Sequence, residues 1–154
     1  IADILPEGED KGYIASLLRE MMEGILPYAD AQTGLYWQVV DQGGREGNYL
    51  ETSGSSMMAY AMMKGARLGF LPNKYAVQGK KTFDGIVNRY LSFEGDNLVL
   101  GGICLVAGLG PESDRRRDGT YAYYISEPVV QNDAKGAAPF VMCYTEVMRL
   151  NPEG

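Results

Sequence analysis

An uninterrupted run of seven apolar residues, Met57–Met63, constrains the fold more than any other feature of the sequence. It is far shorter than the ~20 residues that a membrane-spanning helix requires. On a helix, such a run presents apolar side chains in almost every direction, so the helix must be covered on several sides. We therefore predict a buried inner helix from about Thr52 to Leu68, with Thr52 or Ser53 as its N-cap.

Three other segments have the apolar spacing of amphipathic helices. The first runs from Gly12 to about Leu26, after a lead-in that ends at Asp10, its predicted N-cap. The second begins after Asn73 and extends to about Leu91. The third covers Lys135–Leu150 and is expected to stop at Asn151–Pro152, because proline cannot continue a helix.

The segments between these helices are long and rich in turn-forming residues. Residues 93–110 combine β-branched residues with repeated glycines, which predicts a β-hairpin or an irregular insertion. Tyr121–Ile125 is aromatic and predicted to be extended, and residues 127–133 are predicted to form a loop. The order helix, long loop, helix, helix, long loop, helix indicates an all-α array of helical pairs with short β-hairpin insertions.

Composition excludes several classes of function. The net charge of −6 argues against nucleic-acid binding, which requires a basic surface, and the arginines of Asp114–Asp118 are flanked by acidic residues. The chain has no histidine, which excludes Ser-His and Cys-His nucleophilic pairs and most zinc sites. Cys104 and Cys143 lie in apolar surroundings and are interpreted as buried free thiols rather than a disulfide. We expect no cofactor and no metal.

The stretch Gly34–Ser56 gathers an aromatic pair, a glycine-rich middle and a small-residue entry into the buried helix, and we interpret it as the wall of a ligand pocket. Tyr36 and Trp37 could stack on a sugar ring, or one of the two could belong to the core, because neighbouring strand residues point to opposite faces. The Gln38 amide could bond sugar hydroxyls or a loop carbonyl.

The second half of this stretch is the start of the buried helix. Ser53 and Ser55 offer hydroxyls beside the free N–H groups of a helix N-terminus, which suit a carboxylate on a ligand, although ordinary capping would select the same residues. Glu51 is a carboxylate next to an apolar helix and therefore needs a partner. It belongs either to the pocket or to a structural salt bridge.

Several motifs in the same order resemble glycoside hydrolase family 105, the unsaturated rhamnogalacturonyl hydrolases, which are related to the unsaturated glucuronyl hydrolases of family 88. The motifs are GLYWQVVDQGGREGNYLETSGSSMMAYAMMKGARLGFL, GGICLVAGLG and RRDGTYAYYISEPVVQNDAKGAAPF, followed by the last helix. The resemblance extends from residue 11 to the end and covers only the C-terminal portion of the family pattern. It implies that residues 1–154 are part of a single (α/α)6 six-hairpin barrel domain with a pocket at one end.

In that family an aspartate acts as general acid and base, and hydrates the 4,5-double bond of an unsaturated uronic acid so that the sugar leaves. This aspartate and the Arg/Trp motif that grips the substrate belong to the N-terminal part of the family pattern and have no counterpart here. The resemblance therefore assigns no catalytic residue to this chain. It also implies that the RDGTY turn lies near the pocket, with Thr120 and Tyr121 at the substrate. Arg117 either joins them there or, like Asp118, holds the loop; for Arg117 and Asp118 a capped turn with a local ion pair is the alternative.

These observations lead to two functional hypotheses. One is a glycoside hydrolase of pectin degradation that acts on unsaturated rhamnogalacturonan-derived oligosaccharides, with this chain supplying part of the pocket. The other is a non-catalytic carbohydrate-binding or scaffold domain that retains the α/α fold.

In either case we expect a partner for the exposed inner faces, either the N-terminal half of the barrel or a second copy, and no membrane association. The free cysteines and the resemblance favour the cytoplasm, with the periplasm as the alternative. Glu127 and Asp133 are interpreted as solvated loop residues rather than an acid/base pair.

Overall fold

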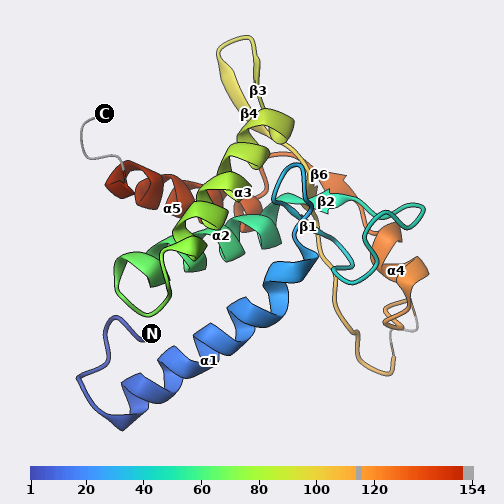
Figure 1. Cartoon of the computed structure of the whole chain (residues 1–154). Coiled ribbons are helices and arrows are strands. Elements are labelled where there is room, and N and C mark those ends of the chain that lie inside the picture. The colour runs from blue at the N-terminus through green and yellow to red at the C-terminus, as the bar shows by residue number, and fades with distance from the viewer. Residues whose placement is uncertain (114–115, 151–154) are drawn as a thin grey trace.

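The computed structural model describes residues 1–113 and 116–150, so Asp114, Arg115 and the predicted stop at Asn151–Pro152 lie outside it. Four long helices dominate the chain (Figure 1). They are α1 (Glu9–Ile25), α2 (Thr52–Arg67), α3 (Lys74–Tyr90) and α5 (Ala134–Leu150), and they match the predicted helices within a few residues. A 3-10 turn, Leu26–Tyr28, continues α1, and a short helix, α4 (Tyr121–Ser126), precedes α5.

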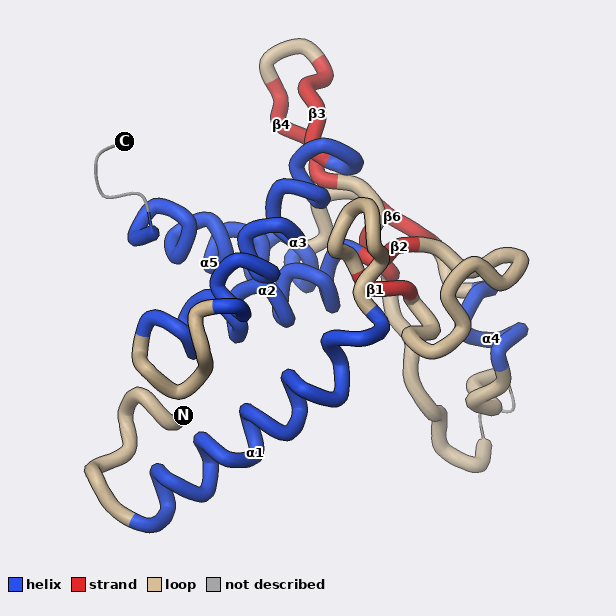
Figure 2. The backbone as a smooth tube through the Cα atoms, viewed as in Figure 1, coloured by secondary structure: helices blue, strands red, loops and turns tan. Residues whose placement is uncertain are grey.

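The strands form three separate antiparallel pairs, which Figure 2 shows as short segments between and beside the helices. β1 (Tyr36–Trp37) pairs with β2 (Leu50–Glu51), and β5 (Ile103–Cys104) pairs with β6 (Val129–Val130). β3 (Leu91–Glu94) and β4 (Asn97–Leu100) form the predicted β-hairpin, with Phe93 opposite Leu98. The chain is therefore mostly helical with small β insertions, as the sequence predicts.

The main core lies where α2 packs against both α3 and α5. Phe83 of α3 and Phe140 of α5 stack with their ring centroids 5.2 Å apart. Gly79 lets α3 approach α2 closely, since a Cβ at this position would lie 2.8 Å from the carbonyl oxygen of Ala59. The core consists of Leu35, Leu50, Ala59, Met63, Phe83, Ile86, Leu100, Ile103, Phe140, Cys143 and Val147.

A second apolar cluster attaches α1 to the rest of the molecule. It joins Met22 of α1 to Met62 of α2, Tyr75 of α3, Tyr36 and Leu71. Figure 1 shows α1 as a long rod beside the other helices, and Leu18 and Met22 from its middle and C-terminal half pack into this cluster. The exposed large apolar side chains on the long helices are Tyr13, Leu17 and Met21 on α1, Met57 on α2, Val77 on α3, and Val141, Met142, Tyr144 and Met148 on α5.

The prediction that α2 is buried on most sides is confirmed, since Met57 and Arg67 are its exposed residues. Ala59, Met62 and Met63 are fully buried, whereas Met57 is 50% exposed. α2 packs mainly against α3 and α5 and also contacts Met22 of α1, whereas Met57 lines the pocket onto which the start of α2 opens. No helix within the described residues is long and apolar enough to cross a bilayer.

Three local predictions are corrected by the structure. Asp10 lies inside α1, whose N-cap is Gly8 without a side-chain hydrogen bond. The N-cap of α2 is Glu51 rather than Thr52 or Ser53. Residues 121–126 are helical rather than extended, because Thr120 caps them by accepting a hydrogen bond from the Tyr123 N–H. The prediction of two buried free thiols is confirmed for Cys104 and Cys143.

Candidate functional site

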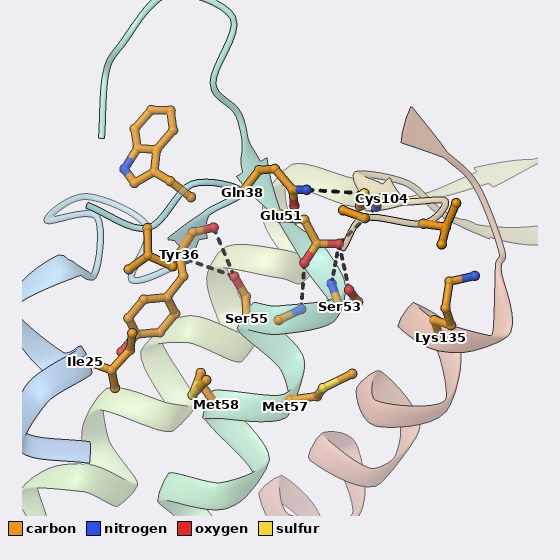
Figure 3. Close-up of a pocket in the computed structure, with 15 residues that line it drawn as sticks. Ile25, Tyr36, Gln38, Glu51, Ser53, Ser55, Met57, Met58, Cys104 and Lys135 are labelled. Carbon is orange, nitrogen blue, oxygen red and sulfur yellow. Dashed lines mark hydrogen bonds between the residues drawn. The ribbon is translucent and has the colours of Figure 1, made fainter. Parts of the chain in front are cut away.

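A pocket of about 430 Å³ opens where β1, the first turn of α2, the segment after β5 and the start of α5 meet (Figure 3). Six of the predicted site residues line it: Tyr36, Trp37, Gln38, Glu51, Ser53 and Ser55. The remaining wall is mostly apolar and consists of Ile25, Val40, Gly54, Met57, Met58, Cys104, Val106, Ala107 and Lys135. Tyr36 and Glu51 are on opposite strands of the β1–β2 pair, which is why the two halves of Gly34–Ser56 meet here.

Glu51 is the buried carboxylate at the centre of this pocket (Figure 3). Its Oε1 accepts hydrogen bonds from the Ser53 N–H at 3.0 Å, the Ser53 hydroxyl at 2.8 Å and the Cys104 N–H at 3.0 Å. Its Oε2 accepts one from the Gly54 N–H at 2.6 Å. Glu51 is 5% exposed and, among the described residues, forms no ion pair. It therefore lines the pocket and caps α2, and it is held by hydrogen bonds rather than by a salt bridge.

This arrangement changes what the start of α2 can offer a ligand. The N–H groups of Ser53 and Gly54 already donate to Glu51, so they do not form the free anion site suggested by the sequence. The Ser55 hydroxyl accepts from the Tyr36 N–H at 2.9 Å and thereby fixes β1 against α2. Because a carboxylate has about four lone-pair positions, Oε2 of Glu51 can accept a further hydrogen bond from a donor in the pocket.

The aromatic pair contributes to the wall and to the core. Tyr36 is 3% exposed and borders the pocket while packing in the cluster around Met22. Burial, with a smaller contribution from Tyr75, raises the pKa of Tyr36 to about 12. Trp37 is half-buried, and the backbone of Gly43 lies against its indole, where an added Cβ would be 3.0 Å from Nε1.

Gln38 and Cys104 are linked across the back of the pocket. The Gln38 amide nitrogen donates to the Cys104 sulfur at 3.3 Å. Burial raises the pKa of the nearby Tyr49, and the neighbouring Cys104 adds to the shift. The Gln38 amide thus has a protein partner that the sequence did not indicate, because Cys104 lies far away along the chain.

The second predicted cluster, Arg117, Thr120 and Tyr121, does not line this pocket. Thr120 is the cap of α4, and its hydroxyl donates to Asp118 Oδ1 at 2.7 Å. Hydrogen bonds from the backbone and side chain of Thr120 lower the pKa of Asp118. The Tyr121 hydroxyl donates to the Glu46 carbonyl at 2.9 Å, and the Arg117 carbonyl accepts from the Gly110 N–H at 3.1 Å.

Among the pocket residues that were not sequence candidates, Lys135 and Cys104 carry an amino group and a thiol. Lys135 stands at the first turn of α5, and its Nζ is 2.6 Å from Asp133 Oδ1, an interaction that lowers the pKa of Asp133. Local sequence could not identify either residue, since each reaches the pocket only through tertiary packing.

Glu127 is 4% exposed and pairs with Arg116 at 3.0 Å, so it is not the solvated residue that was expected. Within the described part of the chain, no group of three or more His, Cys, Asp or Glu residues could hold a metal.

Comparison with solved structures gives the class of protein. The chain superimposes on a family 105 glycoside hydrolase of C. acetobutylicum ATCC 824 with a TM-score of 0.90 and 39% identity. A possible family 105 member from Salmonella enterica serovar Paratyphi A matches with a TM-score of 0.78 and 25% identity. Each comparison covers 96% of this chain, but 41% and 35%, respectively, of the other protein. The fold is therefore that of part of an (α/α)6-barrel glycoside hydrolase.

The chain belongs to Glycosyl Hydrolase Family 88, whose family model matches residues 1–151. Among curated proteins it is 39% identical over 152 residues to the 24.9 kDa protein in the picA locus of Rhizobium radiobacter. The chain spans 65% of the length of that relative. The resemblance noted in the sequence is thus confirmed at the level of the family.

Proposed function

We propose that this chain supplies part of the substrate pocket of a glycoside hydrolase that acts on unsaturated uronyl oligosaccharides derived from rhamnogalacturonan. In the reaction, water adds across the 4,5-double bond of the terminal sugar, and the resulting hemiketal opens and releases its partner sugar. The observation that carries the proposal is the pocket between β1, α2 and α5, in an otherwise helical chain of Family 88.

The chemistry of the pocket suits such a ligand. Tyr36 and Trp37 provide aromatic surface beside a largely apolar wall, which suits the C–H face of a pyranose ring. Oε2 of Glu51 and the Ser53 hydroxyl oxygen can accept hydrogen bonds from sugar hydroxyls. Lys135 provides the positive charge in this wall and suits the uronate carboxylate.

The general acid of the proposed reaction lies outside this chain. Glu51 does not fill that role, because it accepts four hydrogen bonds and thereby caps α2.

We propose that residues 1–154 form the C-terminal portion of one barrel domain, and that an N-terminal half or a second copy covers the exposed apolar side chains of α1 and α5. The two buried free thiols favour the cytoplasm over the periplasm as its location.

Hydrolysis of an unsaturated rhamnogalacturonan disaccharide tests the proposal, followed as loss of absorbance of the conjugated double bond. The protein is assayed as isolated with any polypeptide that co-purifies, and Trp37→Ala and Lys135→Gln should each lower the rate. No loss of absorbance in the complete assembly would refute the assignment of substrate.

The satisfied hydrogen bonding of Glu51 also favours a second candidate, a non-catalytic carbohydrate-binding or scaffold domain. Sedimentation and calorimetry distinguish the two. A second polypeptide or a homo-oligomer with turnover supports the hydrolase, whereas a compact 16.9 kDa monomer that binds the disaccharide without consuming it supports the binding domain.

A further inference from the structure

The loop between β1 and β2, residues 41–48 and here called the glycine-rich loop, is closed at its neck by a single side chain. The Asn48 amide nitrogen donates to the carbonyls of Val39 at 2.9 Å and Gln42 at 2.8 Å. Its oxygen accepts from the Val39 N–H at 3.1 Å. Backbone turns from Gln42 to Val39, Arg45 to Gln42 and Asn48 to Arg45 shape the rest. The loop therefore behaves as a compact unit that can be held from outside.

One side of the glycine-rich loop packs against Trp37, a residue of the pocket wall. Gly43 packs directly against the indole of Trp37, because a Cβ there would lie 3.0 Å from Nε1 and 3.2 Å from Cδ1. Gly43 does not have a positive φ, so its requirement is for space rather than for backbone conformation. A displacement of this loop would free the indole from its outer support.

The other side of the same loop is held by α4. The Tyr121 hydroxyl donates to the carbonyl of Glu46 at 2.9 Å, with that of Arg45 at 3.3 Å. The Arg45 guanidinium covers the Tyr121 ring at 3.7 Å from its centroid, and Gly47 lies against Ile125. Figure 1 shows α4 and this loop on the same side of the molecule, away from the helical core.

We infer that Tyr121 is a positioning residue for the pocket, which it serves through the glycine-rich loop rather than by touching a ligand. Tyr121 and Arg45 hold the loop, and Gly43 of the loop holds the Trp37 indole in the pocket wall. Thr120 and Asp118 act indirectly. Thr120, which is hydrogen-bonded to Asp118, caps α4 and thereby fixes the position of Tyr121. That Trp37 serves a sugar-binding wall rests on the proposed function.

Trp37 is the only tryptophan of the chain, so its fluorescence reports this contact without any ligand. In Tyr121→Ala we expect a red shift of the emission. The acrylamide quenching constant should rise roughly two-fold, since loss of an exposed cation–π contact shifts the equilibrium between the held and the displaced loop by about that factor. Tyr121→Phe keeps the ring and should restore most of the wild-type signal. Arg45→Gln, an exposed change that does not threaten folding, should shift the signal in the same direction as Tyr121→Ala.

Tyr13→Ala is the matched control, because Tyr13 is an exposed tyrosine on α1 and should leave the emission unchanged. Far-UV circular dichroism confirms that each variant is folded. Unchanged emission and quenching in both folded Tyr121→Ala and Arg45→Gln would overturn the inference. Because no substrate is used, that outcome is distinct from failure of the proposed function, which would appear as absence of turnover with an intact fluorescence response.

Discussion

The carboxylate of Glu51 accepts a hydrogen bond from the backbone N–H of Cys104 at 3.0 Å, across 53 positions of the chain. The same carboxylate caps α2 through Ser53 and Gly54. One side chain therefore joins the N-terminus of the most buried helix to the strand β5 that borders the pocket. Because three of the four donors to Glu51 are backbone groups, the geometry of this corner depends on Glu51 more than on the Ser53 hydroxyl.

Removal of this carboxylate should be costly. Glu51→Ala leaves the N–H groups of Ser53, Gly54 and Cys104 without their acceptor in a buried site, and we expect a loss of about 3 kcal/mol in the free energy of unfolding. Glu51→Gln should lose less, because it keeps one acceptor oxygen while its NH₂ group faces donors. Urea titration of both variants measures the effect. Glu46→Gln, in the exposed loop, is the control and should remain near wild type, and equal stability of all three would contradict the expectation.

The ion-pair cluster between α2 and α5 predicts a specific dependence of stability on pH. Arg67 donates to Glu146 at 2.6 and 2.9 Å, and Arg149 donates at 2.6 Å. Burial opposes ionisation of Glu146, but the hydrogen bonds from these arginines outweigh it and lower its pKa below 4.5. A carboxyl whose pKa is lower in the folded state adds stability above its unfolded pKa and loses it as the pH falls through the folded value.

Glu146→Gln should therefore be less stable than wild type at neutral pH, and the difference should shrink as the pH is lowered below about 4.5, the ordinary value for this group. Thermal unfolding measured at several pH values tests this. Asp84→Asn removes a surface pair with Lys80 and serves as the control, with a change of at most about 1 kcal/mol. A difference between wild type and Glu146→Gln that stays constant with pH would show that ionisation of Glu146 is not the source.

Two glycines in helices should respond to alanine in opposite ways. At Gly85 of α3 a Cβ would lie 2.1 Å from the carbonyl oxygen of Thr33 and 2.5 Å from Leu35 Cδ1, so Gly85→Ala must displace the turn before β1. We expect it to cost roughly 3 kcal/mol, as overpacking of a tight site does. Gly12 of α1 has open space around its Cβ position, and Gly12→Ala should gain up to about 1 kcal/mol from helix propensity. Denaturant unfolding of the two variants decides the matter, and a stable Gly85→Ala would mean that the contact is not tight in solution.

The sequence was informative where the physics is local. The four long helices follow from apolar spacing, and the β3–β4 hairpin follows from its β-branched residues and turn. Capping was less predictable, because serine and threonine are favoured caps, yet Glu51 reaches the same N–H groups from the preceding strand. The helix at Tyr121–Ser126 was missed, since an aromatic run also suits a strand and only the cap at Thr120 decides between them.

The candidate site likewise contains residues that local sequence identifies and residues that only tertiary packing brings in. Tyr36, Trp37, Gln38, Glu51, Ser53 and Ser55 come together because one antiparallel pair and one helix start connect them within a single stretch. Lys135 and Cys104 join them through packing of α5 and β5 against α2, which no local pattern encodes. Thr120 and Tyr121 were predicted at the substrate, and this stays a prediction; the structure places Thr120 at the N-cap of α4 and Tyr121 in its first turn, against the loop that contacts Trp37.

The two thiols should differ sharply in reactivity. Cys143 is fully buried in the main core, and burial, with a smaller effect of Glu146, raises its pKa to about 12, so almost no thiolate exists at neutral pH. Cys104 borders the pocket. Under native conditions we expect iodoacetamide to label Cys104 slowly and Cys143 not at all, as measured by peptide mass spectrometry. Labelling of both in urea provides the positive control, and Cys104→Ala should abolish native labelling. Modification of Cys143 as fast as Cys104 in the native protein would show that the core around Phe140 opens more readily than its packing implies.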